Sequence, residues 1–171
     1  MDHMIKTSIS NLDVQGISNL NKDSQYLFIS NHRDISLDAA LLNLSLSRAG
    51  HKTFNMAVGN NLMKEKWASD LMRLNKSFII QRSGNKKEIY MGLSLASQFI
   101  QHTILEAGES IWIAQKQGRA KDGIDETDPA MLKMIHLTER KTQSLGQYFN
   151  ALKVVPVSIS YELDPNDCLK A

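Results

Sequence analysis

Short apolar runs alternate along this chain with segments of helical periodicity, and this alternation constrains the fold more than any other feature. The runs that we expect to form buried strands are residues 26–30, 54–59, 77–82, 110–115 and 154–160. Helical spacing covers residues 38–48, 64–74, 86–107 and 129–137, and a further helix is expected to end near Asn150. This order predicts a single α/β domain over residues 1–171, with a mostly parallel or mixed sheet and helices on both faces.

Several residues at the ends of these helices support the assignment. Ser36 or Asp38 is expected to cap the first helix, and Gly108 is expected to close the long helix that begins near residue 86. Asp128, followed directly by a proline, has the pattern of a helix start.

Composition excludes several classes of protein. The net charge of +2 is too small to indicate a nucleic-acid partner. A single cysteine, Cys168, excludes an intrachain disulfide and favours a reducing compartment, so we expect a cytoplasmic protein. No run approaches 18 apolar residues, and no set of His, Asp and Glu has the spacing of metal ligands. The sequence therefore predicts neither a membrane span nor a metal, and it calls for no cofactor.

Polar clusters follow three of the predicted strands. They are "NHRD" at 31–34, "QR" at 81–82 and "KQGRAKDG" at 116–123. Because ligands of parallel α/β folds bind beyond the carboxyl ends of the strands, these clusters predict a site on one rim of the sheet.

The letters His-Arg-Asp at 32–34 also open the catalytic loop of protein kinases. That loop carries a magnesium-binding asparagine five residues after its aspartate, whereas Ala39 occupies this position here. No glycine-rich phosphate loop precedes the motif, and only 31 residues lie upstream of it. The kinase interpretation is therefore rejected.

A second signature fits the chain over residues 14–161. The lead-in "VQGISNLNKDSQYLFISNHRDISLD" is followed in order by "FIIQR" at 78–82, "KQGRAKDG" and "VVPVSIS" at 154–160. These four blocks resemble those of the glycerolipid acyltransferases, the superfamily of lysophosphatidate and glycerol-3-phosphate acyltransferases. The resemblance implies an acyltransferase-like fold and transfer of a fatty acyl group from acyl-CoA or acyl-carrier protein to a glycerol-phosphate-type hydroxyl.

The same resemblance implies a histidine and an aspartate as the catalytic pair. A neutral imidazole suits removal of a proton from an alcohol, and a carboxylate on its other nitrogen fixes the tautomer. His32 is the expected base. Five residues separate His32 from Asp38 where the family has four, and Asp34 lies between them. We expect Asp38, at the head of its helix, to be the partner, with Asp34 as the alternative.

The matching positions for binding the acceptor phosphate are Arg82, Gly118 and Arg119, with Lys121 as a weaker addition. Arginine suits this role because its guanidinium binds phosphate through two hydrogen bonds. Arg33 could bind phosphate or pair with Asp34, and the sequence leaves both open.

Three further expectations concern the whole chain. An apolar and basic stripe at 61–78 has three possible roles. It could bind peripherally to the inner face of a membrane, it could pack on the sheet, or it could line an acyl tunnel. The chain stops soon after its last strand, which predicts a C-terminally incomplete domain. The alternatives to a glycerol-phosphate acyltransferase are a non-catalytic lipid- or acyl-carrier-binding module and an acyltransferase with a non-phosphorylated acceptor.

Overall fold

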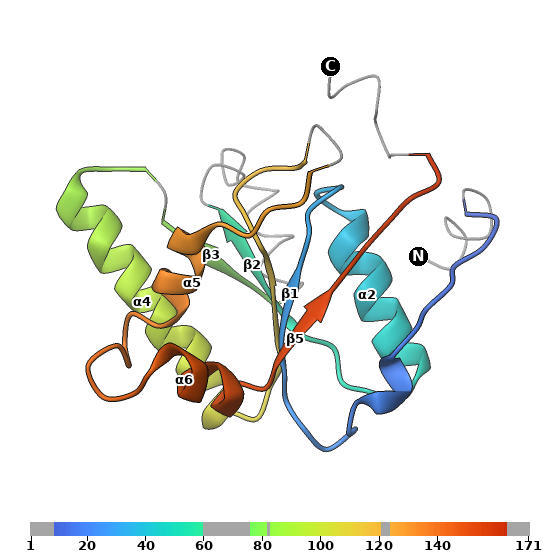
Figure 1. Cartoon of the computed structure of the whole chain (residues 1–171), viewed down its shortest axis with the longest axis horizontal. Coiled ribbons are helices and arrows are strands. Elements are labelled where there is room, and N and C mark those ends of the chain that lie inside the picture. Colours follow the sequence, from blue (N-terminus) through green and yellow to red (C-terminus); the bar gives the residue numbers. More distant parts are fainter. Residues whose placement is uncertain (1–8, 60–75, 82, 121–123, 164–171) are drawn as a thin grey trace.

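The computed structural model describes residues 9–59, 76–81, 83–120 and 124–163, and these form a five-stranded sheet flanked by helices (Figure 1). The strands are β1 (Leu27–Ser30), β2 (Asn55–Gly59), β3 (Ser77–Ile80), β4 (Ile111–Ala114) and β5 (Val154–Val157). The helical elements are η1 (Ile17–Asn19), α2 (Leu37–Arg48), α4 (Lys86–Leu105), α5 (Pro129–Ile135) and α6 (Leu145–Ala151). The helix expected at 64–74 falls outside the described residues.

The strands lie in the order β3-β2-β4-β1-β5, and all their pairings are parallel. Strand β1 therefore lies between β4 and β5, with Phe28 paired to Trp112 on one side and to Val155 on the other. Pro156 lies in β5, at an edge of the sheet, where a missing backbone N–H leaves no ladder bond unmade. The prediction of a parallel α/β sheet is confirmed.

Helices cover both faces of the sheet, as the alternating pattern predicted. Leu27 and Ile111 belong to the apolar cluster that includes residues of α4, α5 and α6. Their neighbours Phe28 and Trp112 point to the opposite face and pack with residues of α2. Figure 1 shows α4, α5 and α6 together on one side of the sheet and α2 on the other. The central strands β1 and β4 are thus mostly buried from both sides, which explains their short continuous apolar sequences, whereas the edge strands β3 and β5 are only partly buried.

The helix-end signals are confirmed at Gly108 and Asp128 but not at the start of α2. Gly108 has a positive φ of 68°, and the Asp128 carboxylate accepts a hydrogen bond from Ala130 N at 2.8 Å. Ser36 occupies the position before α2 without a side-chain capping bond. The predicted cap by Ser36 or Asp38 is wrong, because the Asp34 carboxylate accepts the N–H groups at the start of this helix.

Several predicted elements are longer than those observed. The strand expected over 154–160 ends at Val157 because its partner β1 ends at Ser30 and leaves the sheet as a loop. The strands expected over 77–82 and 110–115 likewise end at Ile80 and Ala114. The helices expected to reach residues 107 and 137 end at Leu105 and Ile135.

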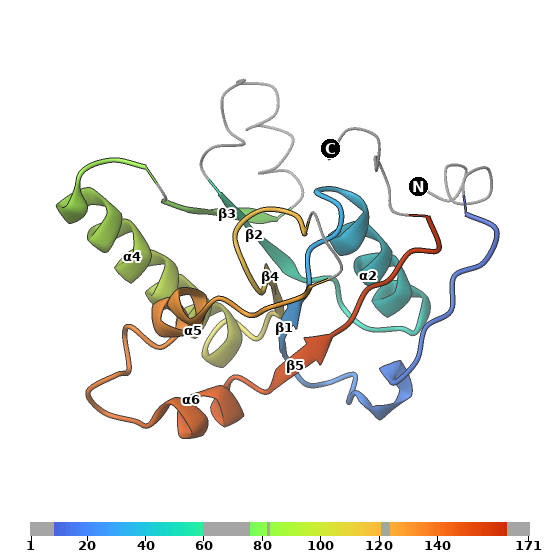
Figure 2. The same ribbon diagram turned by 45° about the horizontal axis from the view of Figure 1, so that its top comes forward.

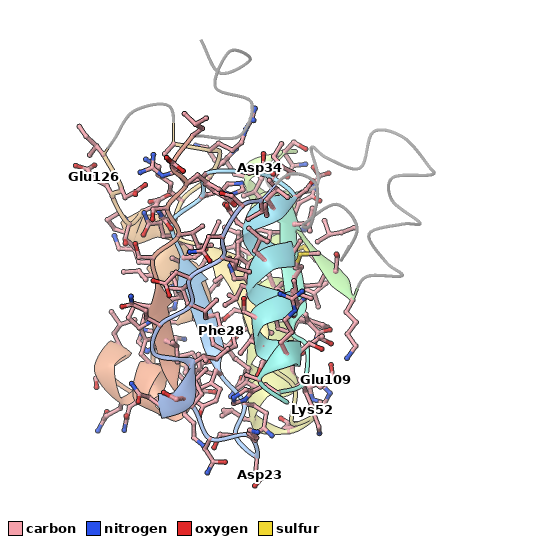
Figure 3. The ribbon with its side chains drawn as sticks, turned by 90° about the vertical axis from the view of Figure 1, so that its right-hand side faces the viewer. Asp23, Phe28, Asp34, Lys52, Glu109 and Glu126 are labelled. Atoms are coloured by element: carbon pink, nitrogen blue, oxygen red, sulfur yellow. The ribbon has the colours of Figure 1, made fainter. Side chains whose placement is uncertain are left out.

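The carboxyl ends of the strands meet at one end of the molecule, which is turned toward the viewer in Figure 2. Figure 3 shows Asp34 and Glu126 at this end, with Asp23 and Lys52 at the opposite end. Among the helices of the described residues, none is long and apolar enough to cross a bilayer. Because the strands are parallel, the loops after β1, β4 and β5 all lie on one rim of the sheet, where the sequence predicted a site.

Candidate active site

The loops that follow β1 and β4 are joined by backbone hydrogen bonds. Gln115 N donates to Ser30 O at 2.7 Å, and Ala120 N donates to His32 O at 2.7 Å. The peptide group of His32 is therefore fixed by the loop that carries Gly118 and Arg119.

Asp38 lies in the first turn of α2 and is fully buried. Its Oδ2 lies 3.0 Å from His32 Nδ1 and also accepts the backbone N–H groups of Arg33 at 2.7 Å and Asp34 at 3.0 Å. Its Oδ1 accepts the hydroxyl of Tyr161 at 2.8 Å. Both oxygens of the buried carboxylate are therefore hydrogen-bonded.

The contact with Asp38 determines how the His32 ring is used. Because the carboxylate can only accept a hydrogen bond, Nδ1 carries the hydrogen and donates it, and the lone pair of the neutral ring is on Nε2. The ring also meets the indole of Trp112 edge-on, with centroids 6.2 Å apart and planes at 72°. The His32 side chain keeps 14% of its surface exposed, so an imidazole of fixed orientation remains accessible to a substrate.

Asp34 has a different place in the same loop. Its Oδ1 accepts the N–H groups of Ser36 at 2.9 Å and Leu37 at 2.8 Å, so the side chain closes the turn before α2. The carboxylate placed against His32 Nδ1 belongs to Asp38, the partner that the sequence analysis favoured.

Arg33 and Asn31 both point toward the loop after β4. The guanidinium of Arg33 donates to Asp125 Oδ2 at 2.8 Å, and Asn31 Nδ2 donates to the same oxygen at 3.0 Å. The sequence left phosphate and Asp34 open as partners of Arg33 and gave no signal for Asp125. A role for Arg33 in phosphate binding stays a prediction.

The four predicted phosphate-binding positions are only partly described. Gly118 has a φ of +79°, a conformation that favours glycine, and it turns the chain just before Arg119. Arg119 is half-buried, and none of the described residues forms a hydrogen bond or ion pair with its guanidinium. Arg82 and Lys121 fall outside the described residues, as does most of the 61–78 stripe. Arg119 is thus the cation of this set that lies within the described residues.

A cavity of about 420 Å³ extends along α2 from Asp38. Asp38, Leu41, Leu42 and Ser45 line it at the spacing of successive helical turns. The rest of its wall comes from residues 12–20, from β5 and from residues 158–159, and Figure 2 shows the N-terminal segment on the α2 side of the sheet. A mainly apolar cavity therefore adjoins the polar pair of His32 and Asp38.

Sequence reasoning missed Tyr161 and Asp125 and gave no role to the side chain of Asn31. Asn31 follows directly after a predicted buried strand, and this position was the available signal for it. Tyr161 lies 123 positions from Asp38, so no local pattern links the two. No cluster of three or more His, Cys, Asp or Glu residues suited to a metal occurs in the part of the chain that is described.

A family model described as acyltransferase matches residues 11–160. The chain belongs to the acyltransferase family. No individual curated protein matches it. The match covers the loop of His32, the helix of Asp38 and the turn of Gly118 and Arg119, so the candidate site lies within the acyltransferase domain. The family prediction from the four sequence blocks is confirmed at the level of this domain.

Proposed function

We propose that this acyltransferase moves a fatty acyl group from acyl-CoA or acyl-carrier protein to a hydroxyl of a glycerol-phosphate-type acceptor. The observation that carries the proposal is the 3.0 Å contact between His32 Nδ1 and the fully buried Asp38 carboxylate. This arrangement suits a general base, because it presents Nε2 to the substrate and stabilises the imidazolium that forms.

The reaction requires no covalent acyl-enzyme. The acceptor oxygen attacks the thioester carbonyl carbon while His32 Nε2 takes the hydroxyl proton. The tetrahedral intermediate then collapses, the C–S bond breaks, and the imidazolium returns its proton to the departing thiolate. The products are the ester and the free thiol, and His32 is neutral again. Asp38 stays ionised throughout and stabilises the charged imidazolium.

The two parts of the substrate have separate candidate binding surfaces. The cavity beside Asp38 is mainly apolar and of a size common for ligand sites, so it suits the acyl chain. Arg119, which has no partner among the described residues, suits the acceptor phosphate. Because such products are lipids, we also propose peripheral contact with a membrane surface during the reaction.

The test is release of free thiol from palmitoyl-CoA with glycerol 3-phosphate or lysophosphatidate as the acceptor. His32→Ala should abolish release, and Asp38→Asn should reduce kcat by up to about 10⁴-fold, as loss of an orienting carboxylate does in other enzymes. Asp34→Asn is the matched control: it should reduce activity far less, because its carboxylate bonds the backbone and not the imidazole. The reverse order for the two aspartates, in folded proteins, would exchange their roles.

The same assay separates the alternatives. A binding module of this fold would release no thiol above background with any acceptor. This should hold both with palmitoyl-CoA and with palmitoyl-loaded acyl-carrier protein as the donor. An acyltransferase with a non-phosphorylated acceptor would be active with monoacylglycerol or another neutral alcohol and would not respond to substitution of Arg119.

A further inference from the structure

The side chain of Tyr161 reaches Asp38 from the opposite end of the sequence. Its hydroxyl donates to Asp38 Oδ1 at 2.8 Å, whereas His32 and the two backbone N–H groups all bond Oδ2. Among the described residues, the Tyr161 hydroxyl is thus the hydrogen-bond donor to Oδ1 of the fully buried Asp38 carboxylate. An unsatisfied oxygen at such a place would be costly, which makes this contact important for the charge on Asp38.

Asn31 holds the segment that delivers Tyr161. Its Oδ1 accepts the N–H of Ile159 at 2.8 Å, and its Nδ2 donates to the carbonyl of Ile159 at 2.8 Å. This pair of bonds replaces the strand ladder two positions after β5 ends at Val157. Asn31 is buried and adjoins His32 in the chain, so it connects the base to the segment after β5.

We propose that Tyr161, placed by Asn31, is a positioning residue that fixes the orientation and charge of Asp38 and through it the basicity of His32. The role rests on the proposed function of His32 and Asp38. Neither residue is hydrogen-bonded to the His32 imidazole: Asn31 bonds the backbone at Ile159 and the carboxylate of Asp125, and Tyr161 bonds the carboxylate of Asp38.

The direction of the effect follows from the hydrogen bond. Without the Tyr161 hydroxyl, more negative charge remains on the Asp38 carboxylate, and this favours the protonated imidazole. A smaller fraction of His32 is then the free base near neutral pH. Among the described residues, the other charged groups around this loop are Asp34, the ion pair of Arg33 with Asp125, and Arg119 on the neighbouring loop, and the substitution leaves all of these in place.

The experiment uses Tyr161→Phe in the full chain, because phenylalanine keeps the ring and removes only the hydroxyl. The titration of the His32 imidazole is followed by NMR, with His32→Ala to assign its signal, and kcat and KM are measured across pH. We expect the titration midpoint and the acid limb of kcat/KM to move to higher pH. We expect kcat near neutral pH to fall about 10-fold, with little change in KM. Losses of this size are found when the hydrogen-bond partner of a metal-binding histidine is substituted.

Two further variants separate positioning from general damage to the fold. Tyr90→Phe removes a hydroxyl from an exposed tyrosine on α4 and should leave both the midpoint and kcat unchanged. Asn31→Ala should move the midpoint in the same direction as Tyr161→Phe. If Asn31 acts through Tyr161, the double variant should have the midpoint of Tyr161→Phe alone.

The outcomes distinguish this proposal from the proposed function. An unchanged His32 midpoint in folded Tyr161→Phe would overturn the positioning role, even if His32→Ala abolishes turnover. A shifted midpoint in a protein that never releases thiol would keep the positioning role and overturn the proposed function. An additive shift in the double variant would remove Asn31 from the proposal.

Discussion

Two aspartates four positions apart do different work because α2 begins between them. Asp34 precedes the helix, and its side chain accepts the N–H groups of Ser36 and Leu37, which the helix leaves without partners. Asp38 lies one turn later and points back, so it accepts the N–H groups of Arg33 and Asp34 and meets His32. The position relative to the helix start therefore explains which carboxylate orients the imidazole.

The residues of the candidate site differ in how far the sequence could predict them. His32 lies in the loop before α2 and Asp38 in the first turn of that helix, only six positions later. A local sequence motif could therefore predict the pair. Tyr161 meets Asp38 across 123 positions, and Asn31 meets Asp125 across 94. These contacts depend on the arrangement of three loops on one rim, and no spacing within the sequence encodes that arrangement.

Arg119 allows a test of acceptor recognition at a single residue. Arg119→Lys keeps the charge but loses the two-pronged geometry of the guanidinium, so the KM for glycerol 3-phosphate should rise. The expected loss in the binding free energy of the acceptor is about 1–3 kcal/mol, the usual effect of breaking a charge-assisted hydrogen bond to a buried or partly buried partner. Steady-state kinetics with palmitoyl-CoA should show little change in the donor KM.

Arg140→Lys is the matched control for this substitution, because Arg140 is exposed in the loop after α5. It should leave both KM values unchanged. If Arg119→Lys also leaves the acceptor KM unchanged, Arg119 does not bind the phosphate.

At the scale of elements, periodicity predicted the described strands and most helices, and missed mainly their ends. The sequence over 154–160 alternates like a strand to its end, yet the pairing with β1 stops at Ser30 and Val157. Beyond this point Ile159 is still bonded, but to the side chain of Asn31 in place of a strand. A strand ends where its partner ends, and this is a property of the sheet that the strand's own sequence does not contain.

Helix α2 offers a test of the acyl-chain cavity. Ser45 lines the cavity two turns from Asp38 and is buried, so Ser45→Phe should fill the part of the cavity that is distant from His32. The variant should then prefer shorter acyl chains. The measurement is kcat/KM for a series of acyl-CoA donors with chains of about 8 to about 18 carbons, because ligands over this range of sizes fill such a pocket to different extents.

A larger side chain elsewhere on α2 provides the control. Ser47→Phe changes an exposed position that does not line the cavity and should leave the preference as it is. Overpacking can also destabilise a core, so thermal unfolding of both variants should accompany the kinetics. An unchanged chain-length profile in a folded Ser45→Phe protein would place the acyl chain elsewhere.

For the whole molecule, the sequence predicted the layers but not the order of the strands. The alternation of strands and helices predicted a mostly parallel or mixed sheet, and all the strand pairings of the structure are parallel. The order β3-β2-β4-β1-β5 places the first and fourth strands side by side, and only packing of the complete chain decides it. This order brings the loop of His32 between those after β4 and β5.

The two sides of the sheet also differ in their packing. The side of α2 contains the cavity next to Asp38, whereas the side of α4, α5 and α6 contains the larger apolar cluster. Tyr148 on α6 is fully buried in that cluster, and its hydroxyl has no hydrogen-bond partner among the described residues. A buried hydroxyl of this kind costs stability that a phenylalanine would not.

Tyr148 therefore links the stability of the whole domain to alkaline pH. Burial, and next the charge of Glu139, raise the pKa of Tyr148 to about 12, whereas a tyrosine in the unfolded chain ionises near 10. Above about pH 10, Tyr148 ionises in the unfolded chain before it ionises in the folded protein, and this favours unfolding. The contribution of neutral Tyr148 to the free energy of unfolding is therefore complete below about pH 10 and is lost as the pH rises toward 12. A pKa difference of about two units corresponds to a total loss of about 3 kcal/mol in the free energy of unfolding.

Tyr148→Phe should remove this alkaline loss and should be neutral or more stable by about 1 kcal/mol at pH 7, because the unsatisfied hydroxyl is gone. The free energy of unfolding in urea, measured at pH 7 and between pH 10 and 11.5, tests both expectations. Tyr90→Phe serves as the control, since that tyrosine is 53% exposed and its removal should change neither value. If Tyr148→Phe is destabilised at pH 7 and falls in parallel with the wild type at alkaline pH, the hydroxyl has a stabilising partner and burial does not control its ionisation.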